Sequence, residues 1–195
     1  MTESARAAST EPRPEVYISV DLETAGPHPR EYSILSIGAC LVDDPDAAFY
    51  VELQPESAAV VEGALQISGL DMAALARDGV APAEAMRRFG DWVARVVPEG
   101  SVPVFVAFNA PFDWMFVEDA FQRHLGRNPF GHSALDVKAY HMGLTGGTWA
   151  RTSMRELSPR YLGGRPLTHN ALGDARDQAE LFRALRAEAR ERPRP

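Results

Sequence analysis

The sequence predicts a single α/β domain, with a five-stranded mixed sheet flanked by helices on both faces. Its 195 residues and 45% hydrophobic content suit one domain with a sizeable core. Five stretches carry the short apolar patterns of strands, and longer stretches with helical spacing lie between and after them. The turn-forming residues 43–46 join two of the strands as a hairpin, which excludes a purely parallel sheet.

The first half of the chain supplies three of the strands. Residues 16–23 alternate between two faces, and Val20 and Leu22 lie on the apolar one. Residues 34–42 and 47–53 follow as the second and third strands, on either side of the hairpin turn.

The middle of the chain alternates helices with a strand. Helices are expected near residues 71–77 and 82–97, and a fourth strand over residues 102–108. A helix over residues 110–125 follows, with Asn109 as its N-cap and a proline in its first turn.

A short strand near residues 134–136 and a helix from about residue 171 to 189 complete the fold. The last helix carries an apolar stripe formed by Leu172, Ala175, Ala179, Phe182 and Leu185. We expect a disordered arm over residues 1–14, a folded domain over residues 15–187, and a fraying, flexible tail over residues 188–195.

Composition narrows the function class. A formal net charge of −7 argues against a protein that coats DNA through a basic surface, but allows an enzyme that holds only a strand end. The one cysteine, Cys40, excludes a disulfide within the chain and reads as a small buried hydrophobe. With neither a secretory signal nor a membrane-spanning apolar run, we expect a soluble cytoplasmic protein.

Asp21 and Glu23 form the first motif with a chemical meaning. Residues two apart on a strand point to the same face, so their carboxylates lie side by side and repel each other unless a cation binds them. Hard divalent cations prefer carboxylate oxygens. The alternative is an exposed strand end that enters a turn.

Asp113 forms the second motif, in the first turn of the helix over residues 110–125. An acidic residue there complements the helix dipole, which is the structural interpretation. Its position favours a functional one, because sites in open α/β sheets gather where strands end and helices begin.

His169 and Asp174 form the third motif. Asn170 is expected to cap the last helix, which places His169 just before that helix and Asp174 in its early turns, beside the apolar stripe. Histidine can carry a proton near neutral pH, although a lone histidine before a helix is usually structural.

Together, the three motifs resemble the DEDDh exonucleases of the ribonuclease H-like superfamily, which include proofreading exonucleases, oligoribonuclease and ribonuclease T. The shared pattern is Asp-x-Glu on a first strand, Asn-x-x-x-Asp opening a helix, and His-x-x-x-x-Asp opening a last helix. The resemblance covers about residues 15–187. It implies a ribonuclease H-like fold and 3′-to-5′ hydrolysis of single-stranded nucleic acid.

Among these relatives, the sequence leans towards ribonuclease T. Residues 23–26 look like its first motif, and residues 127–130 resemble the segment ahead of its fifth strand. Pro27 and Ile67 depart from the pattern, because they stand where that enzyme carries base-stacking phenylalanines.

The resemblance also implies residue roles. Asp21, Glu23, Asp113 and Asp174 are expected to hold two Mg²⁺ or Mn²⁺ ions, with His169 as the general base. Contacts with the terminal nucleotide are expected from Leu22, Thr24, Asn109 and Phe112. Since ribonuclease T and oligoribonuclease are homodimers, a homodimer is an expectation here as well.

Several other residues have two interpretations. Trp114 and Trp149 are weaker candidates for base stacking, since tryptophan on a helix is more often part of a core. The arginines before the last motif either contact phosphates or form a solvated helix face: Arg151, Arg155, Arg160 and Arg165.

Other functions remain open at this point. The chain could be a catalytically inactive nuclease-like binding module, a metal-dependent phosphoesterase acting on small nucleotides, or a proofreading subunit that needs a polymerase. The sequence also does not decide between RNA and DNA, since that choice depends on contacts with the 2′-hydroxyl.

Overall fold

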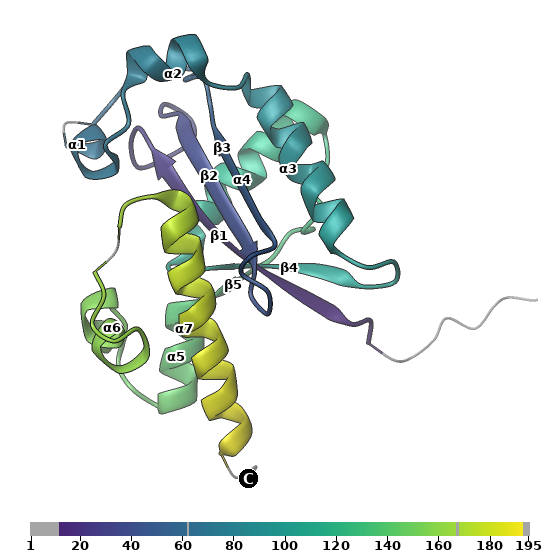
Figure 1. The fold of residues 1–195 in the computed structure, drawn as a ribbon, viewed down its shortest axis with the longest axis vertical. Helices are drawn as coiled ribbons and strands as arrows, with labels where there is room; N and C mark the ends of the chain where they lie inside the picture. Colours follow the sequence, from purple (N-terminus) through teal and green to yellow (C-terminus); the bar gives the residue numbers. More distant parts are fainter. Residues whose placement is uncertain (1–11, 62, 167, 193–195) are drawn as a thin grey trace, which may run out of the picture.

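The computed structural model describes residues 12–61, 63–166 and 168–192, and its centre is a five-stranded mixed sheet of order β3-β2-β1-β4-β5 (Figure 1). The strands are β1 (Glu15–Thr24), β2 (Ile34–Leu41), β3 (Ala48–Glu52), β4 (Val102–Ala107) and β5 (Ala134–Asp136). The predicted fold class is therefore confirmed.

Strand directions decide which residues can meet. Strands β1, β2 and β3 form antiparallel pairs, whereas β4 runs parallel to β1 and β5 runs parallel to β4. The carboxyl ends of β1, β4 and β5 consequently lie at the same edge of the sheet.

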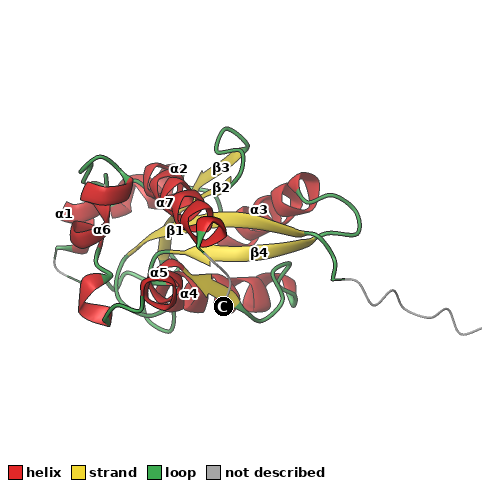
Figure 2. Ribbon diagram, turned by 90° about the horizontal axis from the view of Figure 1, so that it is seen from below, coloured by secondary structure: helices red, strands yellow, loops and turns green. Residues whose placement is uncertain are grey.

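Helices cover both faces of the sheet (Figure 2). They are α1 (Ala64–Ser68), α2 (Met72–Asp78), α3 (Pro82–Val96), α4 (Ala110–Leu125), α5 (Val137–Thr145), the 3₁₀ helix η1 (Trp149–Arg151), α6 (Met154–Tyr161) and α7 (Ala171–Glu191). None of the helices in the described ranges is long and apolar enough to cross a membrane.

The two larger hydrophobic clusters lie between the sheet and its helices. One joins β1 residues such as Ile18 and Val20 to α3 and α4. The other joins Val106 of β4 and Cys40 of β2 to α5, α6 and α7. Since Val20 faces the α3–α4 side, the alternation of β1 turns Asp21 towards α7.

The bounds of α1, α5 and α6 were not predicted from the sequence. The five residues of α1 are bounded by Gly63 and Gly69, both in the left-handed region, and are too few to show a helical period. Helices α5 and α6 flank a glycine- and threonine-rich stretch that conceals their short apolar patterns.

The ends of the chain differ from expectation in one place. Helix α7 continues to Glu191, past the expected domain end at residue 187. Glu188 accepts hydrogen bonds from Arg160, Tyr161 and Arg192, which ties this last turn to α6. Most of the expected N-terminal arm (residues 1–11) and the last three residues of the expected tail lie outside the described residues.

Candidate active site

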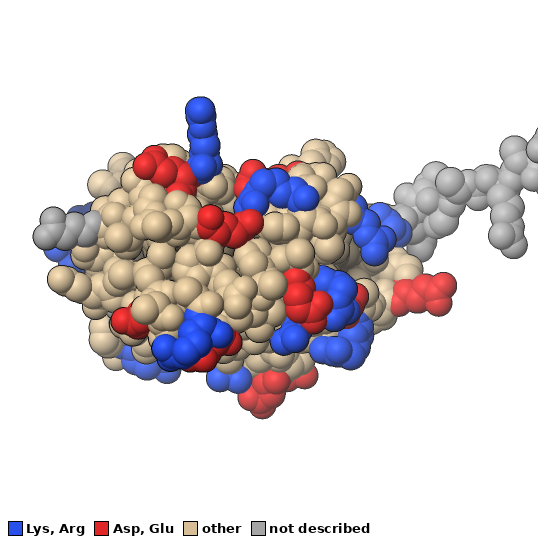
Figure 3. Space-filling model, turned by 90° about the horizontal axis from the view of Figure 1, so that it is seen from above, with Lys and Arg blue, Asp and Glu red and all other residues tan. Residues whose placement is uncertain are grey.

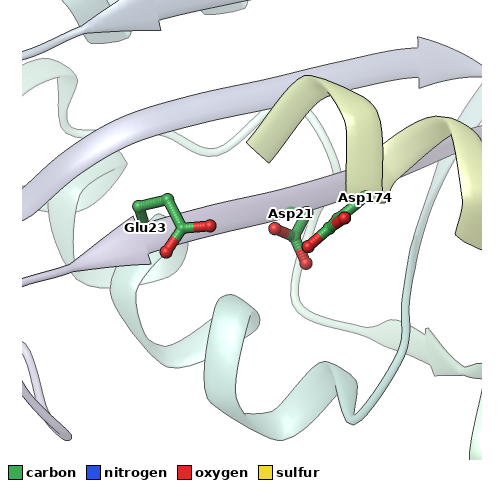
Figure 4. Close-up of side chains that lie close together, drawn as sticks. All are labelled: Asp21, Glu23 and Asp174. Carbon is green, nitrogen blue, oxygen red and sulfur yellow. The ribbon is translucent and has the colours of Figure 1, made fainter. Parts of the chain in front are cut away.

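Three of the predicted carboxylates meet at one point of the fold (Figure 4). Asp21 and Glu23 project from β1, and Asp174 projects from the start of α7. Each offers an oxygen such that the three oxygens lie within 4.8 Å of one another. This spacing brings together segments about 150 residues apart in the sequence, and it is compatible with a shared cation.

Gly38 explains how α7 comes so close to β1. It pairs with Asp21 across the β1–β2 ladder, and a Cβ added to it would lie 2.2 Å from the carbonyl carbon of Ala171 and from the amide nitrogen of Leu172. The first turn of α7 therefore rests directly on the backbone of β2. This contact places Asp174 over the strand that carries Asp21 and Glu23.

Asp174 is held by the loop that precedes α7. One carboxylate oxygen accepts hydrogen bonds from the amide and hydroxyl groups of Thr168, at 2.8 and 2.9 Å, and the other accepts from the amide of His169 at 3.1 Å. Asn170 caps the helix as expected, since its side chain accepts from the amide of Gly173 at 3.0 Å. Asp174 is buried, with 3% of its surface exposed.

Asp113 lies on the other side of β1, in the first turn of α4. It is buried, and one of its carboxylate oxygens accepts a hydrogen bond from the amide of Leu22 at 3.1 Å. It stands outside the three-carboxylate group but close enough to raise the pKa of Asp21. The structure thus brings all four predicted carboxylates into one neighbourhood.

Burial destabilises the charged form of three of these carboxylates and so raises their pKa values. Burial first, and then Asp113 and Asp174, raise the pKa of Asp21 well above its ordinary value. Burial and Asp174 raise the pKa of Glu23 to about 7, and burial raises that of Asp113 to about 8. Among the described residues, no arginine or lysine forms an ion pair with these carboxylates, so this set of oxygen ligands fits a hard cation.

We therefore expect the stability of the metal-free protein to fall as the pH rises from about 4 to about 8. Ordinary carboxyl pKa values are about 4, so over this range the folded protein binds protons that the unfolded chain has released. Saturating Mn²⁺ should oppose this fall, because the cation binds the deprotonated carboxylates. Thermal melts at several pH values, with EDTA or with Mn²⁺, measure both effects. A metal-free melting temperature that rises over this range would contradict the raised pKa values.

Gln178 is a site residue that the sequence did not reveal. Its buried amide nitrogen donates to a carboxylate oxygen of Asp21 at 2.5 Å, and its amide oxygen accepts from the backbone amide of Phe108 at 2.9 Å. Gln178 thereby fixes Asp21 relative to the carboxyl end of β4. It lies one helical turn after Asp174, which was the only available hint.

Asn109 differs from its predicted role as a side-chain cap. It occupies the N-cap position of α4 in the left-handed region, with φ of 69°, and its side chain makes no capping bond. Asp136 takes over instead, because its carboxylate accepts from the amides of Ala110 and Ala139, at 2.6 Å each. One aspartate thus ties the start of α4 to the start of α5.

The residues expected to contact the terminal nucleotide lie around the carboxylates. Leu22 lies between Asp21 and Glu23 in the sequence, and its side chain is buried. Phe112 is half-buried and packs against Phe116, with ring centroids 5.4 Å apart. The hydroxyl of Thr24 donates to the carbonyl oxygen of Gly26 at 2.9 Å. Asn109 is exposed at the same edge of the sheet.

His169 is exposed and adopts the left-handed region, with φ of 53°. Its backbone amide binds Asp174, but its imidazole is not part of the carboxylate cluster among the described residues. The loop therefore holds His169 beside the site without placing its ring between the acidic groups.

The tryptophans and arginines that had two interpretations differ in their exposure and in their ion pairs. Trp114 packs against Phe105 with ring centroids 5.2 Å apart, whereas Trp149 is 50% exposed. Three of the four arginines form ion pairs: Arg151 with Glu156, Arg160 with Glu188, and Arg165 with Asp177 and Glu180.

Comparisons with known proteins consistently find nucleases. Residues 16–186 match the family model described as a 3′-5′ exoribonuclease Rv2179c-like domain. The chain is 43% identical over 171 residues to the 3′-5′ DNA exonuclease Cap18 of Escherichia coli, covering 88% of this chain and 91% of that protein. It is 28% identical over 179 residues to ribonuclease T of Actinobacillus pleuropneumoniae, covering 86% and 82%.

The fold also matches a solved structure, the nuclease domain of 3′hExo, a DEDDh family member bound to rAMP. The TM-score is 0.70 at 14% sequence identity, and the match covers 88% of this chain and 90% of that one. At this identity the likeness concerns the fold.

Proposed function

The chain belongs to the Rv2179c-like family of 3′-5′ exoribonuclease domains and is a DEDDh 3′-5′ exonuclease. On this basis, we propose that it removes nucleotides from the 3′ ends of single-stranded DNA. The observation that carries the proposal is the convergence of Asp21, Glu23 and Asp174 within 4.8 Å, with Asp113 beside them. In the proposed reaction, water adds to phosphorus and the bond to the upstream 3′ oxygen breaks, which releases a nucleoside 5′-monophosphate.

The relative with 43% identity favours DNA as the substrate, because it is a DNA exonuclease and aligns over most of both chains. RNA is the second candidate, because the matching family model describes an exoribonuclease domain. Both substrates have the same phosphodiester, so the carboxylate site serves either one.

Four carboxylates would hold the metals. We assign Asp21, Glu23 and Asp174 to one divalent cation, and Asp21 with Asp113 to a second. When bound, two Mg²⁺ or Mn²⁺ ions stabilise the charge that develops on the attacking and leaving oxygens during hydrolysis. The raised pKa values of Asp21 and Glu23 support the assignment, because a bound cation favours the charged carboxylates that burial disfavours.

His169 is the proposed general base, which accepts the proton of the attacking water. Two observations support this role: its backbone bond to Asp174 anchors the loop beside the carboxylates, and its ring is exposed to solvent. Around it, Leu22 and Phe112 would pack against the terminal base, while Thr24 and Asn109 would bind the terminal sugar and phosphate.

His169→Ala should lower kcat by about 10²-fold or more while leaving metal affinity unchanged, because the imidazole moves a proton and is not a ligand. The measurement is steady-state cleavage of labelled DNA, together with a Mn²⁺ titration of each protein. His132→Ala is the matched control, since His132 is exposed in the loop before β5, at the amino end of that strand. An unchanged kcat in His169→Ala would remove the histidine from the mechanism.

One experiment tests the proposed function as a whole. Matched 5′-labelled single-stranded DNA, single-stranded RNA and duplex are incubated with the protein and Mg²⁺ or Mn²⁺, with and without EDTA. We expect a ladder of products shortened from the 3′ end, fastest on single-stranded DNA and absent with EDTA. Preferred shortening of RNA would establish the second candidate, and intact strands in every lane would overturn the proposal.

A further inference from the structure

We propose that Trp149, Lys138 and Phe108 form a second binding site, which holds single-stranded DNA upstream of the nucleotide that is removed. We call these three residues the upstream site. The inference rests on the proposed exonuclease function. It identifies the residues that bind the rest of the DNA strand.

Trp149 is the first reason. Half of its surface is exposed, whereas Trp92 is buried with 3% of its surface exposed and Trp114 packs against Phe105. An aromatic face of this kind stacks with any base, which suits an enzyme that must accept every sequence.

Lys138 is the second reason. Its ammonium nitrogen lies 4.2 Å from the centroid of the Trp149 ring and 5.8 Å from that of Phe108. Lys138 is the only lysine of the chain, and it forms no ion pair with any residue that the structure describes. By contrast, three of the four arginines in residues 151–165 are paired with acids. Its charge is therefore held by aromatic rings and not neutralised by a described acid, and such an ammonium can pair with a phosphate.

Two connections place the upstream site beside the carboxylates. The amide of Phe108 donates to Gln178, and Gln178 donates in turn to Asp21. Asp136, two residues before Lys138, binds the first amide of α4, the helix that carries Asp113. The upstream site and the carboxylates thus share the edge of the sheet where β1, β4 and β5 end.

The rest of the described surface offers weaker alternatives. A pocket of about 780 Å³ between the β1–β2 loop and α4 is lined by three acids (Glu31, Glu56 and Asp119) and two arginines, and one of these, Arg123, already pairs with Glu56 and Asp119. On the face drawn in Figure 3, basic and acidic side chains are interspersed over a mostly uncharged surface. A phosphate backbone would therefore meet repulsion or little attraction there.

The test compares substrates with and without an upstream strand. The two substrates are single-stranded DNA of 12 nucleotides and the 4-nitrophenyl ester of thymidine 5′-monophosphate. In the ester, a nitrophenyl group replaces the upstream strand and leaves as nitrophenolate. Trp149→Ala should raise KM for the 12-mer by about tenfold and leave hydrolysis of the ester unchanged. Trp149→Phe should restore most of the loss. Leu125→Ala, another exposed hydrophobic residue at the far end of α4, is the matched control.

Lys138→Met gives an independent readout. Loss of one phosphate contact should lower the slope of log KM against log salt concentration by about 0.7 for the 12-mer. Lys138→Arg should keep the slope, and the ester should show no difference between the variants.

The outcomes separate this inference from the proposed function. If Trp149→Ala cleaves both substrates as the wild type does, the upstream site is wrong and the exonuclease function stands. If Trp149→Ala cleaves both substrates more slowly by the same factor, Trp149 is structural and the upstream site is again wrong. If the wild type cleaves neither substrate, the proposed function fails, and the upstream site fails with it.

Discussion

Asp21→Asn is expected to lower exonuclease activity by more than about 10²-fold while the domain remains folded. Asp21 is the carboxylate assigned to both cations, and even the outer hydrogen-bond partners of metal ligands contribute 10–100-fold to affinity or activity. An asparagine keeps the shape and still accepts the hydrogen bond from Gln178, so the fold has no reason to change. Cleavage of labelled single-stranded DNA measures the loss, and circular dichroism checks the fold.

The same variant should gain stability when no metal is present. Removing one of several buried, mutually repelling carboxylates relieves the repulsion, so the melting temperature in EDTA should rise near neutral pH. The wild type, but not Asp21→Asn, should be stabilised strongly by Mn²⁺. Asp46→Asn, in the exposed hairpin turn, is the matched control and should change neither property. Activity of Asp21→Asn within threefold of the wild type would contradict the metal role.

Gly38→Ala is expected to damage both stability and activity through one contact. The new methyl group would lie about 2.2 Å from the backbone of α7, so the helix must move away from the sheet. Overpacking of this kind typically costs about 1–3 kcal/mol. Asp174 moves with the helix, and activity should fall by at least about tenfold, because a misplacement of about 1 Å can cost more than that.

A matched glycine separates the close contact from a general effect of glycine. Gly143 lies within α5 and has no atom within 4 Å of an added Cβ, so Gly143→Ala should be neutral or slightly stabilising. Denaturant melts and cleavage rates of both variants are the measurement. If Gly38→Ala matched Gly143→Ala in stability and in rate, the proposed support of Asp174 by β2 would be wrong.

Local patterns predicted the acidic part of the site. Alternation along one strand placed Asp21 and Glu23 on a shared face, and an N-cap followed by an apolar stripe placed Asp174 at the inner side of the last helix. These features depend on near neighbours in the chain, and the structure agrees with them. The order of the three motifs then supplied the family, which the comparisons confirm.

Contacts between segments that are distant in the chain could not be predicted from the sequence. Gln178 and Gly38 gain their roles only when α7 lies across β1 and β2, because neither residue has a distinctive local pattern. Asp136 replaced Asn109 as the partner of the first amide of α4 because parallel pairing brings the ends of β4 and β5 together. For the same reason, the exposure of Trp149 beside Lys138 could not be read from spacing.

A crystal structure grown with Mn²⁺, analysed for anomalous scattering, tests the central claim most directly. The proposed mechanism predicts two anomalous peaks, one among Asp21, Glu23 and Asp174 and a second between Asp21 and Asp113, with both peaks weakened or lost in Asp21→Asn crystals. If the carboxylates stay in place and no peak lies among them at saturating Mn²⁺, the proposed two-metal hydrolysis is contradicted.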